Sequence, residues 1–234
     1  FVGQSSFATH SIVTARSAIK IDAHHALDLM GPLGCGLTTG VGTVINALKP
    51  PAGSSIAIFG AGTVGLSAVM GSILTGCTTI IVIDPVESRR DMAMQLGATH
   101  TLDPVIGDVA EEIVGITKGG ADFSVECSGV PAAVNAAVMC LGRPGWCAQV
   151  GATPAQTMQP LDMDHIGFGR GIKGVVMGDA NAQTFVPYLA NLHAQGKLPY
   201  DRFVKFYDFS DINKAIADSK SGNVIKPILR IDAR

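Results

Sequence analysis

Residues 60–65 combine glycines and small side chains in the pattern GxGxxG, directly after an apolar run and before a helix-length segment: Gly60-Ala61-Gly62-Thr63-Val64-Gly65. In this pattern the first glycine permits a tight turn, the second lets the backbone approach a pyrophosphate, and the third lets helix and strand pack closely. Backbone N–H groups at the start of the following helix then face the phosphates, and the helix dipole favours their negative charge. The spacing predicts a dinucleotide-binding turn.

An acidic residue stands where such a turn needs a partner for the sugar. Asp84 follows the β-branched run 79–83 and lies 19 positions after Gly65. A carboxylate at this strand end accepts hydrogen bonds from the adenosine ribose hydroxyls and repels a ribose 2′-phosphate. The glycine turn followed by Asp84 therefore favours NAD over NADP. Arg89, five residues further on, either reaches the adenosine end of the coenzyme or is a solvated helix charge.

Three other interpretations of this segment are open. The glycine turn can be purely structural, with an incidental acidic residue after it, and flavin-binding proteins use the same pattern, usually close to the chain start. A membrane span is the third, because residues 50–83 carry no charge and are long enough to cross a bilayer. The short apolar runs 55–59 and 79–83, separated by glycines and a helix-length segment, instead favour a parallel sheet covered on both faces. We expect no membrane partner.

The elements that must position these residues alternate between strand and helix. This alternation predicts an α/β fold, a doubly wound parallel sheet with right-handed crossovers. Strands are expected over 55–59, 79–83, 99–102, 121–127, 146–150 and 172–177, and helices over 63–74, 86–96, 108–117 and 131–141. Helices at 182–195 and 211–219 and strands at 202–206 and 224–231 follow.

Composition excludes several classes of protein. Charged residues make up 15% of the chain, against roughly 25% in an average soluble domain, so a large core is expected. A formal net charge of −2 gives no general attraction to nucleic acid. The cysteines at 35, 77, 127, 140 and 147 form no CxxC pair, which indicates a reducing, cytoplasmic compartment.

The chain opens on Phe1 with strand-like sequence and no signal peptide, and we interpret it as a portion of something longer.

Four blocks of sequence resemble the later two-thirds of the zinc-dependent medium-chain alcohol dehydrogenases. They are the opening 6–10, SFATH; the block 34–40, GCGLTTG; the glycine fingerprint; and the closing 221–229, SGNVIKPIL. Within that family, residues 1–8 and 31–36 are most similar to the aryl-alcohol (benzyl alcohol) dehydrogenases. The resemblance implies a Rossmann domain over 37–176, preceded by part of a GroES-like catalytic domain over 1–36 and followed by its returning segment over 177–234.

The resemblance also implies roles for individual residues. Cys35 matches the third catalytic zinc ligand, although spacing alone would make it a small buried apolar side chain. Thr39 matches a residue lining the nicotinamide, and Val64 the side chain behind its ring. Lys226 stands where the family often has an arginine on the pyrophosphate, and Cys127 lies near the adenosine pocket. The remaining cysteines are interpreted as small core residues.

The adjacent histidines at 24 and 25 receive no role from the resemblance. They precede a helix, with no carboxylate or cysteine recognised at metal spacing, so a surface or capping role is expected for both.

For the complete protein the resemblance implies hydride transfer from a primary, aromatic alcohol to NAD, with zinc as Lewis acid. The other two zinc ligands of the family would precede Phe1, so we expect the chain alone to be inactive. The family forms homodimers or homotetramers by pairing sheet edges, here the strand expected at 172–177. Two alternatives stay open: a zinc-free quinone reductase, against which Cys35 and Asp84 speak, and a nucleotide-binding module without catalysis.

Overall fold

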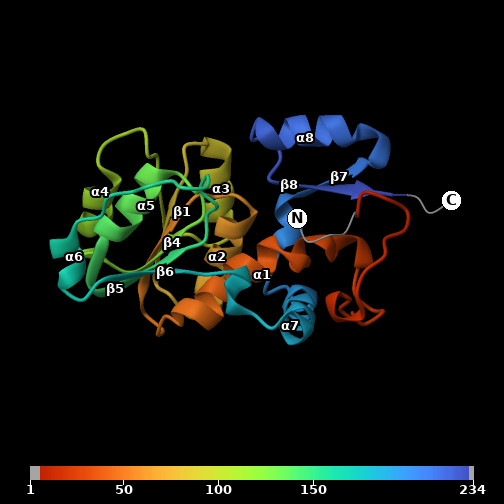
Figure 1. Ribbon diagram of the computed structural model, residues 1–234, viewed down its shortest axis with the longest axis horizontal. Helices are drawn as coiled ribbons and strands as arrows, with labels where there is room; N and C mark the ends of the chain where they lie inside the picture. Colours follow the sequence, from red (N-terminus) through yellow and green to blue (C-terminus); the bar gives the residue numbers. More distant parts are fainter. Residues whose placement is uncertain (1–5, 232–234) are drawn as a thin grey trace. The chain divides into compact units, whose positions relative to one another are not determined.

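Two compact units make up the chain in the computed structural model, which describes residues 6–231. The larger unit is Cys35–Ala180, and the smaller unit combines Phe1–Gly34 with Asn181–Arg234. The expected strand character of residues 1–5 lies outside the described residues. Figure 1 labels the main elements of both units.

The larger unit is built on a six-stranded sheet in which every neighbouring pair is parallel. The strand order β3-β2-β1-β4-β5-β6 is that of doubly wound dinucleotide-binding domains, so the predicted fold class is confirmed. The strands are β1 (Ser55–Phe59), β2 (Thr79–Ile83), β3 (His100–Leu102), β4 (Ala121–Glu126), β5 (Leu141–Gln149) and β6 (Gly171–Gly174).

Helices cover both faces of this sheet because its strands are apolar on both sides (Figure 1). On β1, Ala57 and Phe59 point to one face of the sheet and belong to a core that includes residues of α4 and α5. Ile58 points to the other face and lies near Gly65 at the start of α2. The helices are α1 (Gly36–Gly42) with its π-helical extension η4 (Thr43–Leu48), α2 (Thr63–Leu74), α3 (Glu87–Gln95), α4 (Val109–Thr117), α5 (Pro131–Met139) and α6 (Met163–Gly167), with the short turn η5 (Met177–Asp179) at the end.

The uncharged stretch 50–83 is thus divided among β1, α2 and β2. Within residues 6–231, no helix has both the length and the apolar character needed to cross a membrane.

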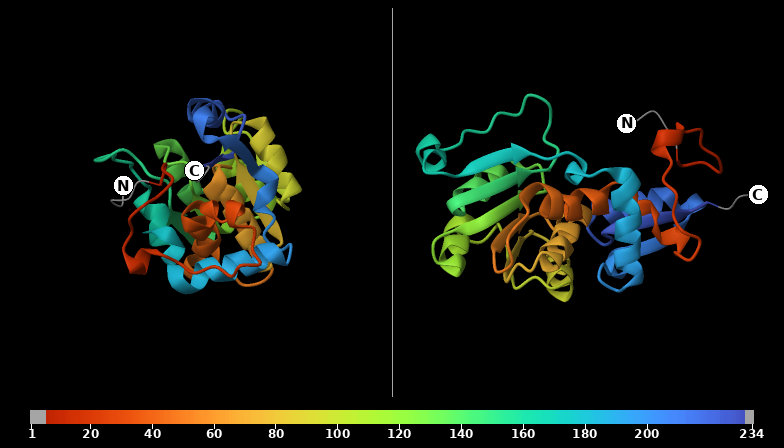
Figure 2. Two further views of the ribbon diagram at one scale, coloured as in Figure 1. Left: turned by 90° about the vertical axis from the view of Figure 1, so that its right-hand side faces the viewer. Right: turned by 90° about the horizontal axis from the view of Figure 1, so that it is seen from below.

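The smaller unit contains a two-stranded parallel sheet and two main helices. Strand β7 (Val204–Asp208) pairs with β8 (Lys226–Arg230), and α8 (Ile212–Lys220), which Figure 2 also shows, packs on this pair around Tyr207, Ala215 and Val224. The other elements are η1 (Ala15–Ser17), η2 (Leu27–Leu29), η3 (Gly31–Gly34), α7 (Ala182–Ala194), η6 (Tyr200–Phe203) and η7 (Phe209–Asp211). The Tyr200 hydroxyl donates to the Leu29 carbonyl at 2.7 Å, which ties η6 to η2.

The structure differs from the expected elements in two places. Strand β5 begins at Leu141 rather than at 146, since its glycines and proline look like a turn in sequence although they lie within a strand. Helix α6 lies in a stretch for which no element was expected; Asp162 caps it by accepting from the Asp164 and His165 amides.

Candidate functional site

The turn between β1 and α2 has the geometry that its glycines predict. Gly60 has φ +94°, a conformation that strains any side chain. A Cβ at Gly65 would lie 1.7 Å from the Gly60 carbonyl oxygen, so helix and turn touch there through backbone alone. A Cβ at Gly62 would meet no atom within 4 Å, which leaves open space above the start of α2. The third glycine therefore serves packing, and the second leaves room for a ligand.

Asp84 is fixed beside this turn at the carboxyl end of β2. Its side chain accepts hydrogen bonds from the Ala61 amide at 2.7 Å and the Val86 amide at 2.9 Å. The residue is only 3% exposed. Its oxygens still have lone pairs to offer, because a carboxylate accepts about four hydrogen bonds. The carboxylate is thus held rigidly with acceptor capacity remaining.

Two arginines follow on α3 and behave differently. The Arg90 guanidinium donates to the Asp84 carbonyl at 2.7 Å and pairs with Asp103 at 3.1 Å, so it braces the backbone. The Arg89 guanidinium lies 3.9 Å from the Asp84 carboxylate, at the limit of an ion pair. Its Nε is buried with no hydrogen-bond partner in the described residues. Arg89 therefore offers a buried N–H donor to a ligand.

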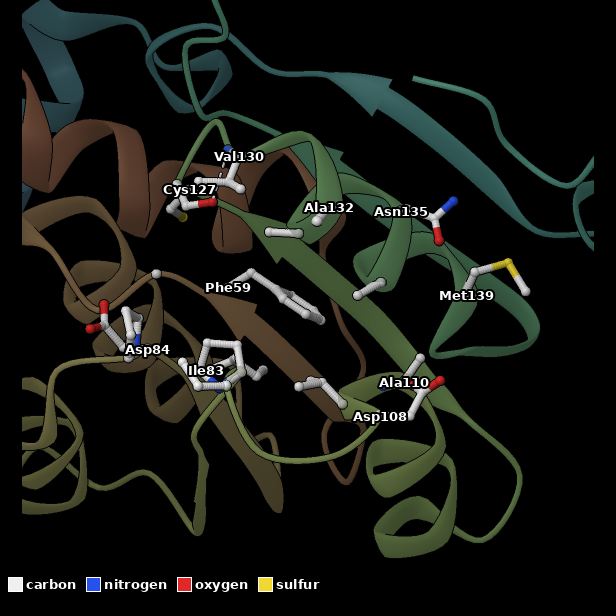
Figure 3. A pocket seen from close by; sticks show the side chains of 18 of the residues that line it. Phe59, Ile83, Asp84, Asp108, Ala110, Cys127, Val130, Ala132, Asn135 and Met139 are labelled. Carbon is white, nitrogen blue, oxygen red and sulfur yellow. Dashed lines mark hydrogen bonds between the residues drawn. The ribbon is translucent and has the colours of Figure 1, made fainter. Parts of the chain in front are cut away.

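The glycine turn, Asp84 and Arg89 contribute to the wall of one cavity of about 1430 Å³ at the carboxyl ends of β1, β2 and β4. Figure 3 shows Phe59 at its centre, with Asp84 and Ile83 towards one side and Cys127 and Val130 towards the other. The sequence-predicted residues that the structure brings together in this wall are Gly60, Gly62, Asp84, Arg89 and Cys127. Thr63, Val64 and Gly65 form the adjoining first turn of α2. Open α/β sheets bind ligands in this place, where the strand order reverses.

The other predicted residues lie elsewhere. Cys35 precedes α1 and its residue is exposed, so the buried apolar side chain that spacing alone suggests is not found. Its role as a zinc ligand stays a prediction. Thr39 is buried one turn later, and its hydroxyl donates to the Met177 sulfur at 3.7 Å. Lys226 begins β8 of the smaller unit, and its predicted role on the pyrophosphate stays a prediction.

Burial keeps the core thiols protonated. It raises the pKa of Cys147 to about 12 and raises the pKa of Cys127 and of Cys140 well above the ordinary thiol value. Only the thiolate is a nucleophile or metal ligand. The cysteines at 127, 140 and 147 are therefore inert at neutral pH, and Cys127 offers the cavity only its bulk.

Sequence reasoning missed Glu126, a fully buried carboxyl group at the carboxyl end of β4. Its oxygens accept from the Ser128 amide at 2.7 Å, the Ser128 hydroxyl, the Gly129 amide at 3.0 Å and the Gln149 amide group at 3.0 Å. It thereby fixes the loop that brings Cys127 and Val130 into the cavity wall. A signal was available: an acidic residue that ends a strand of a sheet covered on both faces is buried and needs hydrogen-bond partners.

The expectation that no carboxylate accompanies His24 and His25 was also wrong. The structure places Asp22 beside them, and ligand atoms of the three side chains all lie within 4.8 Å of one another. A tight turn in which the His25 amide donates to the Asp22 carbonyl at 3.1 Å creates this proximity. The expectation missed this carboxylate because its proximity depends on that turn, which the local sequence did not signal.

Comparison with known proteins decides the family. Residues 63–194, more than half of the chain, match the model of the zinc-binding dehydrogenases. The chain belongs to the zinc-binding dehydrogenase family. The family match agrees with the observed fold, because the matched segment begins with α2 and includes most of the six-stranded sheet.

Three relatives of this zinc-binding dehydrogenase chain illustrate the match. The crystal structure of an alcohol dehydrogenase zinc-binding domain protein from Burkholderia ambifaria is 46% identical with a TM-score of 0.97, over 100% of this chain and 63% of that one. Benzyl alcohol dehydrogenase from Acinetobacter calcoaceticus is 42% identical with a TM-score of 0.96, over 98% and 64%. Geraniol dehydrogenase from Castellaniella defragrans is 39% identical over 98% of this chain. The chain spans 62% of that relative's length.

Proposed function

We propose that this chain binds NAD in the cavity of its larger unit and forms the coenzyme-binding part of an alcohol dehydrogenase. The observation that carries the proposal is the pairing, within one cavity wall, of the open space above Gly62 with the rigidly held carboxylate of Asp84. A dinucleotide needs both features, because its pyrophosphate requires a backbone cradle and its ribose requires an acceptor. The structural-turn alternative accounts for neither the cavity nor the spare acceptor capacity.

Each part of the coenzyme has a matching group on this chain. The backbone amides after Gly62, at the start of α2, would donate to the pyrophosphate, and the helix dipole would favour its charge. Asp84 would accept from the adenosine ribose hydroxyls. The free Nε of Arg89 would donate to an oxygen at the same end of the coenzyme.

At the reacting end, NAD supplies a nicotinamide carbon that accepts a hydride. Thr39 and Val64 are the residues we propose beside that ring. The hydrogen bond from Thr39 to Met177 holds its hydroxyl in one orientation. A buried threonine and a half-buried valine would keep water from the ring and leave one face for substrate.

Zinc fits the described residues only in part. A catalytic zinc needs three protein ligands and an open position, and among residues 6–231 Cys35 belongs to no group of three metal-type side chains. Cys35 is one exposed thiol that such a site could use, but the described residues do not hold the ion by themselves. The alcohol-activating step would therefore depend on groups outside them.

The substrate class proposed is a primary alcohol with an aromatic or other apolar group. Similarity to a benzyl alcohol dehydrogenase and a geraniol dehydrogenase supports this choice. A homodimer or homotetramer is proposed as well. It is supported by the position of β6 at the edge of the sheet, where its outer N–H and C=O groups are available to a second copy.

Replacing Asp84 with serine tests the coenzyme assignment. Hydrogen bonds to a charged acceptor are worth about 1.5–3 kcal/mol, so NADH binding should weaken by about tenfold to 100-fold. NADPH binding should improve, because the repulsion of its 2′-phosphate disappears while Arg89 remains. Fluorescence titrations with both coenzymes measure the change.

Asp108→Asn is the matched control, because Asp108 lines the same cavity and an asparagine caps α4 equally well. Its ratio of NADH to NADPH affinity should equal that of the unmodified chain. A chain that already binds NADPH as tightly as NADH would refute the assignment of Asp84.

A further inference from the structure

The smaller unit carries a cluster of metal-type ligands that the proposed function does not use. Asp22, His24 and His25 lie in the turn before η2, in the red part of the ribbon of Figure 1. Asp22 and His24 are exposed, and His25 is half-buried. Among the residues that the structure describes, these three are the His, Cys, Asp or Glu side chains that come together in a group large enough to hold a metal ion.

The geometry of the cluster is close to that of a coordination sphere. The ligand atoms lie within 4.8 Å of one another, and the two imidazole ring centroids are 4.0 Å apart at an angle of 40°. Ligands about 2.0–2.1 Å from a tetrahedral zinc ion lie roughly 3.3–3.4 Å from one another. Small rotations of exposed side chains, which cost little, bring the three donors to that separation.

The turn is anchored rather than free. The His25 amide donates to the Asp22 carbonyl, which closes the turn. Upstream, the Gln183 side chain of α7 donates to the carbonyls of Arg16 at 2.8 Å and Ala18 at 3.2 Å. A cavity of about 150 Å³ between the turn and α7 is lined by Asp22 and His25 together with Lys20, Ile21, Pro187 and Asn191. A fixed backbone reduces the ordering cost of bringing the ligands together.

The donor set selects the kind of ion. Two imidazoles and one carboxylate suit Zn²⁺, Co²⁺, Ni²⁺ and Cu²⁺, whereas Mg²⁺ and Ca²⁺ prefer sets made only of oxygen. Exposure of Asp22 and His24 leaves the remaining positions of the ion to water. The positive charge of Lys20 in the neighbouring cavity opposes a cation, so the site should release its ion to a strong chelator.

We infer that Asp22, His24 and His25 bind one divalent transition-metal ion, of the zinc class, at a site separate from the coenzyme cavity. Cys35, the family's zinc-ligand position, belongs to the other unit and is not a member of this cluster. The site does not depend on the proposed function, because none of its residues lines the coenzyme cavity. Bound metal would lock the turn onto one conformation.

The test is a zinc titration against a chromophoric chelator, done in a Cys35→Ser background so that the exposed thiol does not contribute. One zinc ion per chain is expected. His24→Gln and Asp22→Asn should each weaken binding by at least the tenfold to 100-fold that is typical for loss of an outer-shell partner alone. The matched control is His100→Gln, another exposed histidine, and it should leave the affinity unchanged.

Cobalt gives a second readout. The Co²⁺ complex should show visible d–d bands without a thiolate charge-transfer band, and the spectrum should be the same with and without the Cys35→Ser change. All these variants alter exposed side chains, and circular dichroism checks that they fold. Absence of stoichiometric zinc in the Cys35→Ser chain, or equal zinc affinity in the Cys35→Ser chains with and without His24→Gln, would overturn the inference.

Discussion

Replacing Gly62 with valine is expected to weaken NADH binding by about 100-fold or more, which corresponds to about 2.8 kcal/mol, while the chain stays folded. The backbone at Gly62, with φ −79° and ψ −168°, lies in a region that valine adopts readily. No protein atom lies within 4 Å of the added Cβ. The branched side chain would therefore occupy only the space assigned to the pyrophosphate.

The measurement is a fluorescence titration with NADH, and unfolding curves recorded in parallel check the fold. Gly115→Val is the control, because a Cβ at Gly115 on α4 also meets no atom within 4 Å, and Gly115 is exposed and does not line the cavity. It should bind NADH as the unmodified chain does. Undiminished affinity in Gly62→Val would place the phosphates elsewhere.

Replacing Gly65 with alanine is expected to lower the free energy of unfolding, whereas Gly62→Val lowers the affinity for NADH in a folded chain. The expected loss of stability is about 3 kcal/mol, the upper end of the usual cost of overpacking. The added Cβ would stand 1.7 Å from the Gly60 carbonyl oxygen and 2.9 Å from its carbon, both backbone atoms. Neither moves without displacing the turn between β1 and α2. The midpoint of chemical unfolding, followed in the larger unit, measures the loss.

Gly115→Ala serves as the matched control for this substitution. Its Cβ meets open space on an exposed helix, so alanine should stabilise the chain by about 0.5–1 kcal/mol through backbone entropy. If Gly65→Ala unfolds at the same midpoint as the unmodified chain, the close contact between helix and turn does not exist in solution.

The grouping of residues in the wall of the cavity could be predicted from sequence because its signals are local. Gly60, Gly62, Gly65 and Asp84 lie within a single strand–helix–strand unit, in which short-range spacing determines which groups meet. The parallel, doubly wound class of the sheet followed from alternation and handedness, whereas the strand order was first seen in the structure. Long-range contacts had no such signal. The hydrogen bond from Thr39 to Met177 joins residues 138 positions apart and depends on the placement of β6 and η5.

Two further misses have specific physical causes. Glu126 looked like the end of a strand. Its partners Ser128 and Gly129 depend on how the loop after β4 folds, and Gln149 joins them because β4 and β5 pair. Asp22 was overlooked as a neighbour of the histidines because its proximity to both depends on a turn, which the local sequence did not signal. In both cases polar side chains converge through backbone geometry rather than through a motif.

The central claim is that the cavity of the larger unit binds NAD, and amide chemical shifts of the ¹⁵N-labelled chain during NADH addition test it most directly. The largest changes are predicted at the amides following Gly62 on α2, at Ala61, whose N–H donates to Asp84, and in the loop at 127–130. The turn at 22–25 of the smaller unit should not respond. Saturable changes confined to residues outside the cavity, or no changes at all, would contradict the account.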